Sequence, residues 1–252
     1  MFWTEEIKEQ VDKYFSDISN PTSIVINDSK TPSDDYDPVD EIPKDQNTHF
    51  EKYLGQPLCN VPAPPNSSHP DMATHFISNF FNIFSKTDIN PTRYRMRDIY
   101  RSGQFDEAIE AILQSTPIIR NIYKAVSGSE KSDSWFPFQP ICEACGRIGT
   151  TLTTNFDGKE VTYSCEPNIV KWAKGCGYKG KVSPFSGNGK LPWKLEWVAK
   201  WKTFNIILEG AGMDHTTKGG SHDVASAILK KFFLSNPLSA FPTDSSYLTD
   251  LK

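Results

Sequence analysis

Two short cysteine-containing turns, CEACG (142–146) and GCGY (175–178), impose the strongest constraint on how this chain can fold. Glycine in such a turn lets backbone N–H groups point at a thiolate sulfur. Between the turns, TLTTNFDGKEVTYSC (151–165) alternates in polarity around Asp157-Gly158, which is a strong signal for a β-hairpin. The segment therefore predicts a unit of two knuckles and a hairpin that gathers four thiols, from Cys142, Cys145, Cys165 and Cys176.

Four thiolates around one point are the ligand set of a structural, tetrahedral zinc ion. Binding of the metal would fold a segment that is too small to hold itself together. The alternative is that Cys165 and Cys176, which are more widely spaced than in a standard zinc ribbon, are merely buried thiols. The segment has no histidine and no open ligand position, so a catalytic zinc is not expected. We expect Cys59, which stands alone, to be structural.

Composition and charge limit the class of protein. The 252 residues include 37% apolar and 23% charged residues, with a formal net charge of −4, which is ordinary for a globular protein. No apolar run approaches the roughly 20 residues that a membrane span needs. The acidic, amphipathic start MFWTEE is unlike a signal peptide. We therefore expect a cytoplasmic protein with no membrane partner and with reduced thiols, which favours metal binding over disulfides.

The spacing of apolar residues predicts the main helices and strands. Helical spacing marks residues 3–15, 70–84, 105–126 with an interruption at Pro117, and 221–234. Short buried strands are expected at 24–26 and 204–208. Residues 28–70 are rich in Asp, Pro and Asn and are interpreted as loop. A loop of this length is unusual in a compact domain and indicates either a functional segment or a faulty assignment.

Glycine, histidine and aspartate follow the strand expected at 204–208, in GAGMDH (210–215) and KGGSHD (218–223). Open α/β sheets bind ligands at the carboxyl ends of their strands, and N–H groups at a helix N-terminus can contact a ligand. Taken alone, two glycines before a helix are more often a plain turn, and a lone His215 is more often structural. The density of Trp, His, Asp and Gly at one strand end favours a site.

Basic residues form two local clusters, which an acidic chain would need for any contact with nucleic acid. On charge alone we favour a solvated face over phosphate contact for both. The clusters are Lys171, Lys174, Lys179, Lys181, Lys190, Lys194, Lys200 and Lys202, and Arg93, Arg95, Arg97 and Arg101.

Taken together, the motifs resemble the archaeal-type class I lysyl-tRNA synthetases. The matching stretches follow the family's order through nearly the whole chain: MFWTEEI, KTPS, DDYDPVD, EKYLGQPLCNVPAP, GQFDEAI, WFPFQPICEACGRIGTT, GCGYKGKVSPFSGNGKLPWKLEWVAKW and GMDHTTKGGSHD. The resemblance implies an α/β fold, with a class I Rossmann-type core and a connective insertion that carries the knuckles. It also implies ATP-dependent activation of lysine and its transfer to tRNA-Lys, by positioning and charge stabilisation.

The resemblance also implies a lysine pocket made of Ser29, Thr31, Asp35, Asp37, Trp193 and His215. Ser29 and Thr31 belong to a first-strand loop that faces the amino acid, and Ser29 stands where the family has glycine. Carboxylates of the acidic loop could hold the ammonium group of lysine. The loop on the nucleotide side would contain Gly219, Gly220, Ser221 and Asp223.

Both signature elements that handle ATP in the family are missing from this sequence. Ser33 is followed directly by Asp34, where the family has a HIGH-type segment, a helix and a strand, on the order of 30 residues. That loss would leave apolar sheet surface and strand edges uncovered. The chain also ends before a KMSKS-type loop and the anticodon-binding region. We therefore expect a weak or inactive chain on its own, with a missing C-terminal part or a partner chain.

These inferences define three segments. Residues 1–70 would be the N-terminal part of the core, 71–185 a helical connective region with the zinc-knuckle module at about 140–182, and 186–252 the second part of the core. We expect a low or broad melting transition. Two alternatives stay open beside the ligase: a non-catalytic zinc-containing remnant or paralogue that binds tRNA or a partner, and a fragmentary or misjoined gene product.

Overall fold

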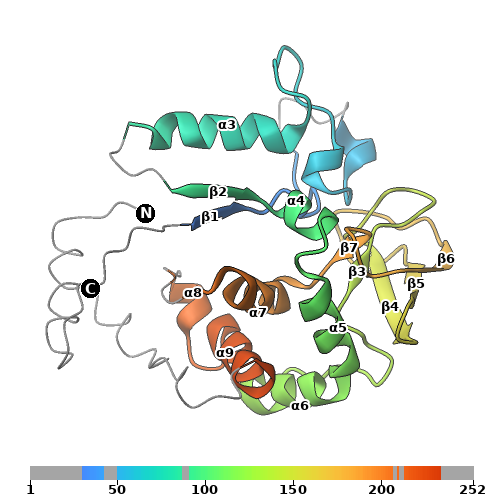
Figure 1. Ribbon diagram of the computed structural model, residues 1–252. Coiled ribbons are helices and arrows are strands. Elements are labelled where there is room, and N and C mark those ends of the chain that lie inside the picture. The colour runs from blue at the N-terminus through green and yellow to red at the C-terminus, as the bar shows by residue number, and fades with distance from the viewer. Residues whose placement is uncertain (1–29, 43–49, 87–90, 207–208, 210–212, 234–252) are drawn as a thin grey trace, which may run out of the picture.

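The computed structural model describes residues 30–42, 50–86, 91–206, 209 and 213–233 (Figure 1). The predicted helix at 3–15, the predicted strand at 24–26 and the pocket residue Ser29 lie outside the described residues. Within the described part, helices and strands are mixed, as an α/β chain requires. No helix among these residues is both long and apolar enough to cross a bilayer.

A parallel pair of strands lies between two helical layers (Figure 1). Strand β1 (Lys30–Ser33) pairs with β2 (Thr92–Arg95), and helix α3 (Met72–Phe84) lies in the connection between them. The prediction that residues 28–70 are all loop is therefore wrong at KTPS, which forms β1. The sequence pattern did not predict this strand, because its hydrogen-bonding partner is distant in sequence and its residues are mostly polar.

The two faces of this small sheet contact different helices. Side chains alternate along a strand, so Arg93 and Arg95 lie on one face and Tyr94 on the other. Arg93 stacks on Phe81 of α3, with 4.0 Å between the guanidinium carbon and the ring centroid. Tyr94 packs on Phe204 of helix α7 (Trp193–Phe204), with ring centroids 4.8 Å apart. The sheet therefore separates α3 from α7.

The other predicted helices are confirmed with small changes of boundary. The helix expected from Pro70 begins at Met72, where Asp71 accepts the Thr74 N–H at 2.6 Å as an N-cap. Pro117 lies in the first turn of a new helix, because its missing N–H has no partner to lose there. The predicted helices are α5 (Asp106–Gln114), α6 (Thr116–Ser127) and α9 (Ser221–Phe232). The structure adds helices that were not predicted: α4 (Met96–Arg101), α8 (Met213–Thr216) and the short 3-10 helices η1 (Glu51–Tyr53) and η2 (Leu58–Asn60).

The strand predicted at 204–208 is wrong at its start. Phe204 is the last residue of α7, and Asn205 ends that helix in the left-handed conformation, with φ +50°. The short apolar run was ambiguous between strand and helix, because α7 is buried on nearly all sides and shows no clear amphipathic period. Residues 207 and 208 lie outside the described part of the chain.

The cysteine-bearing segment contains the predicted hairpin, and a third strand that was not predicted extends it to an antiparallel sheet. Strand β4 (Thr151–Phe156) pairs with β5 (Val161–Cys165), which pairs with β6 (Lys179–Val182). The hairpin turn is stabilised by Asp157, whose Oδ1 accepts the N–H groups of Lys159 and Glu160 at 3.0 and 2.8 Å. A short pair, β3 (Gln139–Pro140) and β7 (Gly189–Lys190), joins this unit to α7.

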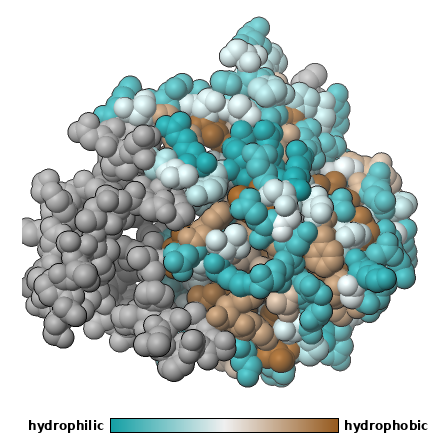
Figure 2. Space-filling view, viewed as in Figure 1, coloured by the Kyte–Doolittle hydropathy of each residue, from teal (hydrophilic) through white to brown (hydrophobic). Residues whose placement is uncertain are grey.

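One main hydrophobic core contains residues from each of the three segments defined above. Tyr36, Phe105 and Leu191 are fully buried in it. A separate, much smaller cluster of Cys142, Tyr163 and Cys165 lies under the cysteine-bearing sheet. Hydrophilic residues gather on the face of the molecule between α3 and α7 (Figure 2).

Candidate functional site

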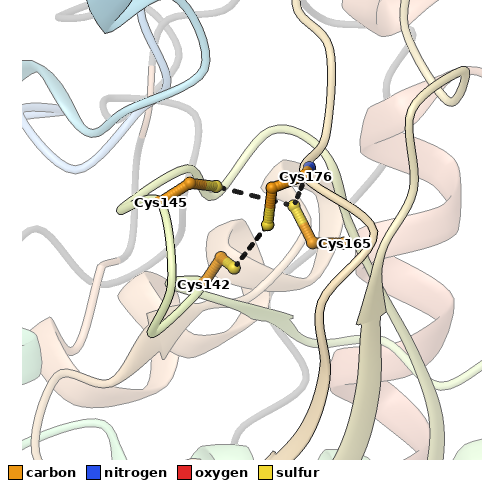
Figure 3. Close-up of side chains that lie close together, drawn as sticks. All are labelled: Cys142, Cys145, Cys165 and Cys176. Atoms are coloured by element: carbon orange, nitrogen blue, oxygen red, sulfur yellow. Dashed lines mark hydrogen bonds between the residues drawn. The ribbon is translucent and has the colours of Figure 1, made fainter.

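The four predicted cysteines converge on one point (Figure 3). Their sulfur atoms all lie within 4.8 Å of one another, and the Cys142–Cys176 and Cys145–Cys165 Sγ–Sγ distances are both 3.7 Å. A tetrahedral metal ion with metal–sulfur bonds of about 2.3 Å places its sulfurs about 3.8 Å apart. A disulfide would need about 2.05 Å. The four thiols therefore fit the coordination sphere of a single metal ion.

Glycine turns and nearby donors prepare this cluster for thiolates. Gly146 and Gly177 adopt φ of +72° and +82°, in the left-handed region that the two knuckle turns require. The Cys176 N–H donates to Cys165 Sγ at 3.4 Å, and the Thr150 hydroxyl lies 3.2 Å from the same sulfur. Burial raises the pKa of the Cys165 thiol, and both of these contacts act against that rise. The arrangement can hold a metal ion and offers no open position for a substrate.

A second constellation consists of aromatic and histidine rings on α7 and α8. The Trp193 and His215 ring centroids lie 4.7 Å apart, and Trp197 lies 4.8 Å from Trp193 and 5.9 Å from His215. Trp193 is 41% exposed, so its ring is accessible to a ligand. The structure thus brings together the two pocket residues that the resemblance places after the knuckles.

Sequence reasoning missed other members of this aromatic group. Trp197 Nε1 donates to Glu209 Oε1 at 2.8 Å, and Trp201 Nε1 donates to the other oxygen. Trp201 also lies 5.5 Å from the His222 ring. The four-residue spacing of Trp193, Trp197 and Trp201 is the signal that could have revealed one helix face. Tryptophan faces beside a carboxylate attract a cation.

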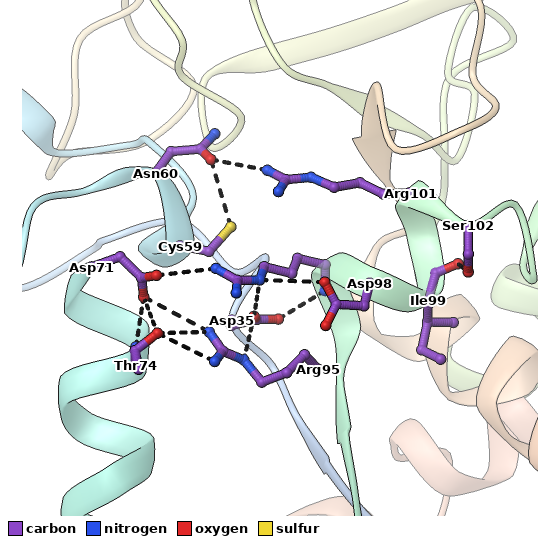
Figure 4. A network of polar contacts seen from close by, with 11 residues as sticks. Asp35, Cys59, Asn60, Asp71, Thr74, Arg95, Asp98, Ile99, Arg101 and Ser102 are labelled. Carbon is purple, nitrogen blue, oxygen red and sulfur yellow. Dashed lines mark hydrogen bonds and ion pairs between the residues drawn. The ribbon is translucent and has the colours of Figure 1, made fainter. Parts of the chain in front are cut away.

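Asp35 lies in a separate polar cluster beside the N-terminal end of α3 (Figure 4). Its side chain is 0% exposed, and it accepts the Arg95 Nε–H and the Arg97 backbone N–H, both at 2.8 Å. Arg97 also pairs with Asp71 at 3.0 Å. Burial raises the pKa of Asp35, although its contacts with Arg97 and Arg95 act against this. Asp35 thus links the end of β1 to α3 and α4 inside the protein.

Thr31 and Asp37, the other described pocket candidates, also have distinct surroundings. Thr31 pairs with Arg93, so it lies on the sheet face toward α3, away from α7. Asp37 forms an ion pair with Lys190. The structure therefore brings Trp193 and His215 together, but it places Thr31, Asp35 and Asp37 in other clusters.

A buried ionic network, which the sequence did not reveal, holds the acidic loop in place. Glu196 is 3% exposed, and its carboxylate lies 3.1 Å from both Lys190 Nζ and Lys200 Nζ and accepts the Tyr100 hydroxyl at 2.7 Å. Lys200 also pairs with Asp34, just as Lys190 pairs with Asp37. The network therefore ties the Asp34–Asp37 loop to β7 and α7.

The protonation of this network follows from its charges. Burial acts to raise the pKa of Glu196, but Lys190, Lys200 and Tyr100 outweigh it and lower the pKa to about 2. Burial acts to lower the pKa values of both lysines, yet the Glu196 charge and the loop aspartates raise them. Burial and the Glu196 charge raise the pKa of Tyr100 well above its ordinary value. Both lysines and Glu196 are therefore charged at neutral pH.

The glycine loop predicted on the nucleotide side begins α9. Gly220 is the N-cap residue before Ser221, and the Gly219 N–H donates to Asp223 Oδ2 at 2.8 Å. Gly219 adopts φ +73°, and a Cβ there would lie 2.8 Å from the Val126 carbonyl oxygen of α6. In this structure the loop therefore serves as a helix cap and as a close contact with α6.

Comparisons with known proteins identify the family. Residues 9–243 match the family described as tRNA synthetases class I (K). The chain is 34% identical over 218 residues to the lysine–tRNA ligase of Methanosphaera stadtmanae, covering 86% of this chain and 39% of that protein. It is 32% identical over 216 residues to the lysine–tRNA ligase of Archaeoglobus fulgidus, covering 86% and 42%. It thus spans about two fifths of the length of these curated relatives. The chain belongs to the tRNA synthetases class I (K) family, the class I lysyl-tRNA synthetases.

Proposed function

We propose that this chain carries part of the Rossmann-type catalytic core of a cytoplasmic lysine–tRNA ligase, which activates lysine with ATP and transfers it to tRNA-Lys. Beside family membership, the proposal rests on the Trp193–His215 pair, whose rings lie 4.7 Å apart at the start of α7. In this proposal the tryptophan faces and Glu209 attract the ammonium group of lysine, and His215 limits the width of the pocket. The start of α9 lies beside the nucleotide.

We expect Trp193→Ala to weaken lysine binding by about 3- to 30-fold, the range of a partly desolvated cation–π contact. His215→Ala should also weaken it, because the pocket becomes wider. Titration calorimetry of the folded chain with lysine would measure the effect. His75→Ala, a half-buried histidine on α3, is the matched control and should leave the affinity unchanged. Unchanged lysine affinity in both pocket variants would remove this pocket from the proposal.

We also propose that the chain on its own activates lysine weakly or not at all, because the segment that contacts the ATP phosphates in the family does not follow Ser33 here. Lysine-dependent ATP–pyrophosphate exchange should stay at background in an assay where the Methanosphaera stadtmanae ligase, run in parallel, is active. Exchange by this chain at about 1 s⁻¹ or faster, the ordinary range of enzymes, would contradict the expectation. Lysine binding without exchange is the expected result.

We propose that the cysteine cluster binds one structural zinc ion. Four thiolates are soft ligands that suit zinc, and a closed tetrahedral set is typical of structural sites. The metal would supply folding free energy to the β4–β6 sheet. Cys142 and Cys145 would anchor the first knuckle, Cys165 the end of the hairpin strand β5, and Cys176 the second knuckle.

The alternative function, tRNA binding without catalysis, is favoured by the surface of the same unit. Lys179 and Lys181 alternate on β6 and are exposed, with Tyr178 exposed beside them. Lysines with an exposed aromatic ring are typical of nucleic-acid contact. Salt-sensitive tRNA binding by a chain that does not bind lysine would favour this alternative over the ligase.

A further inference from the structure

Two side chains join the first knuckle to η1 and the residues that follow it. Arg147 comes directly after the knuckle, and its Nε–H donates to the carbonyl oxygen of Leu54, 93 residues earlier, at 2.8 Å. Its Nη2 donates to the Lys52 carbonyl oxygen at 3.2 Å. Both carbonyl groups lie at the end of η1, where a helix leaves such groups without an internal partner. In the other direction, Gln56 Nε2 donates to the carbonyl oxygen of Cys145 at 3.3 Å.

The backbone after the first knuckle also lies against this segment. The N–H groups of Ile148 and Gly149 both donate to the Gly55 carbonyl oxygen, at 2.7 and 3.1 Å. A Cβ at Gly149 would lie 2.4 Å from the Trp172 ring and 3.1 Å from Pro38 Cβ, so glycine is what allows this close approach. The knuckle unit therefore reaches Pro38, the residue that directly follows the acidic loop.

Hydrogen bonds continue from the η1 segment into the acidic loop. The Gly55 N–H donates to the Val39 carbonyl oxygen, and the Val39 N–H donates to the Gln56 carbonyl oxygen, both at 2.8 Å. The Leu58 N–H donates to the Asp37 carbonyl oxygen at 2.9 Å. The side chain of Asp37 belongs to the buried ionic network that reaches α7. Contacts thus run without a break from the first knuckle through the acidic loop to α7.

The segment that carries this path has little apolar packing of its own. Its buried members Val39 and Phe50 form a small cluster with Val61 and Met72. A cluster of this size buries too little apolar surface to fix a segment by itself. The position of the acidic loop therefore depends on the hydrogen bonds that the knuckle supplies.

We propose that Arg147 is a positioning residue, through which the metal centre fixes the geometry of the acidic loop. Arginine suits this role because its planar fork presents several donors in a fixed arrangement to two carbonyl groups at once. While the four cysteines hold a metal, the first knuckle keeps Arg147 against the end of η1. When the metal is lost, the knuckle opens, and η1 and the acidic loop lose their support. The proposal rests on the zinc site proposed above.

Hydrogen exchange of single amides, measured by NMR on the full chain, tests the proposal. In Arg147→Gln the Val39 and Gly55 amides should exchange about tenfold faster or more, because two charge-assisted hydrogen bonds are lost. The zinc content and the protection of the β4–β5 amides should stay as in the wild type. Arg147→Lys should restore part of the protection, since its ammonium group keeps the charge and can donate to one carbonyl. Arg120→Gln is the matched control, because Arg120 of α6 donates to the Ser132 carbonyl oxygen, at 3.2 Å, away from this segment.

Removal of zinc with a strong chelator tests whether Arg147 and the metal act along the same path. In the wild type, chelation should also accelerate exchange of the Val39 and Gly55 amides by about tenfold or more. In Arg147→Gln it should add a smaller effect, because the path is already broken.

Two outcomes would overturn this inference and leave the zinc site standing. The first is a wild-type chain whose hairpin amides exchange after chelation while Val39 and Gly55 stay protected. The second is an Arg147→Gln chain with the same protection as the wild type. A purified chain that binds no zinc would instead contradict the zinc site itself, and the metal dependence of the acidic loop with it.

Discussion

Cys176→Ser is expected to abolish stoichiometric zinc binding and to unfold the cysteine-bearing sheet. Serine is a poor zinc ligand, so the variant keeps only three thiolates of the four. Structural zinc contributes about 10–16 kcal/mol of apparent binding free energy in small zinc-binding folds. The cluster beneath β4–β6 is small, with Cys142, Tyr163 and Cys165 as its buried members. Without the metal, the sheet keeps only that cluster and the contact of Val161 with the main core, which is too little apolar surface to hold the knuckles and the hairpin in place.

The zinc content of the purified chain and the hydrogen exchange of the β4–β5 amides would measure both effects. Wild-type protein should contain one zinc per chain, and a strong chelator should reproduce the loss of amide protection seen in the variant. Cys59→Ser is the matched control, because it makes the same substitution outside the cluster, where Cys59 Sγ lies 3.7 Å from Asn60 Oδ1. A Cys176→Ser chain that keeps one zinc and a protected hairpin would show that the cluster is not the metal site.

The main core should survive the loss of zinc, which makes the prediction specific to one part of the fold. The buried residues around Phe105, Leu191 and Val224 form a cluster separate from the one under the knuckles. Amide protection in α5, α6 and α9 should therefore persist in the variant while the hairpin amides exchange.

The parts of this fold that the sequence predicted are those with local signals. The hairpin followed from alternation and Asp157-Gly158, and helix α9 from apolar residues at helical spacing. Helix α7 was not predicted, because burial on nearly all sides removes the contrast between two faces. Strands β1 and β2 were missed because each has four residues, mostly polar, and they pair across a long connection. Register across such a distance is set by tertiary packing.

The candidate sites also divide into those with local sequence signals and those that only tertiary packing brings together. The four cysteines could be assigned from spacing and flanking glycines, since two turns and one hairpin bring them together. The Trp193–His215 pair came from the resemblance and could not be deduced from spacing. The network around Glu196 joins residues as far apart in sequence as Asp37 and Lys190. In the sequence these charges are indistinguishable from solvated ones, and only the packing of α7 against the acidic loop buries them.

Glu196→Gln is expected to destabilise the chain by about 3–5 kcal/mol, the usual cost of removing one partner from a buried ion pair. Glutamine keeps the shape of the side chain and can still accept the Tyr100 hydroxyl, so the main loss is the negative charge. Lys190, whose side chain is 4% exposed, and Lys200 would then remain buried with only the loop aspartates as counter-charges. Such a loss is a large fraction of the 5–15 kcal/mol of a typical domain. Urea unfolding at pH 7 would measure it.

Glu107→Gln is the matched control for this substitution. Glu107 lies on α5 and pairs with Lys202 of α7, the helix that carries Glu196. The Glu107 side chain is 84% exposed. Water and salt screen such a pair, so its loss should cost less than about 1 kcal/mol. A Glu196→Gln variant as stable as Glu107→Gln would mean that the buried network contributes no net stability.

The pH dependence of the difference between wild type and Glu196→Gln separates charge from packing. The pKa of Glu196 falls from the ordinary value of 4.5 to about 2 on folding, so the folded chain releases this proton more readily than the unfolded one. The stability that Glu196 contributes is therefore fully present above pH 4.5 and is lost as the pH falls toward 2. Glutamine does not titrate, so the difference in unfolding free energy should shrink by about 3 kcal/mol over this window. Carboxylates away from the network titrate alike in both chains and cancel in the comparison, whereas the pKa of Asp37, which the Glu196 charge helps to raise, falls in the variant. A difference that stays constant from pH 7 to pH 2.5 would assign the effect of the substitution to packing, because a lost charge interaction must disappear when the wild-type carboxylate is protonated.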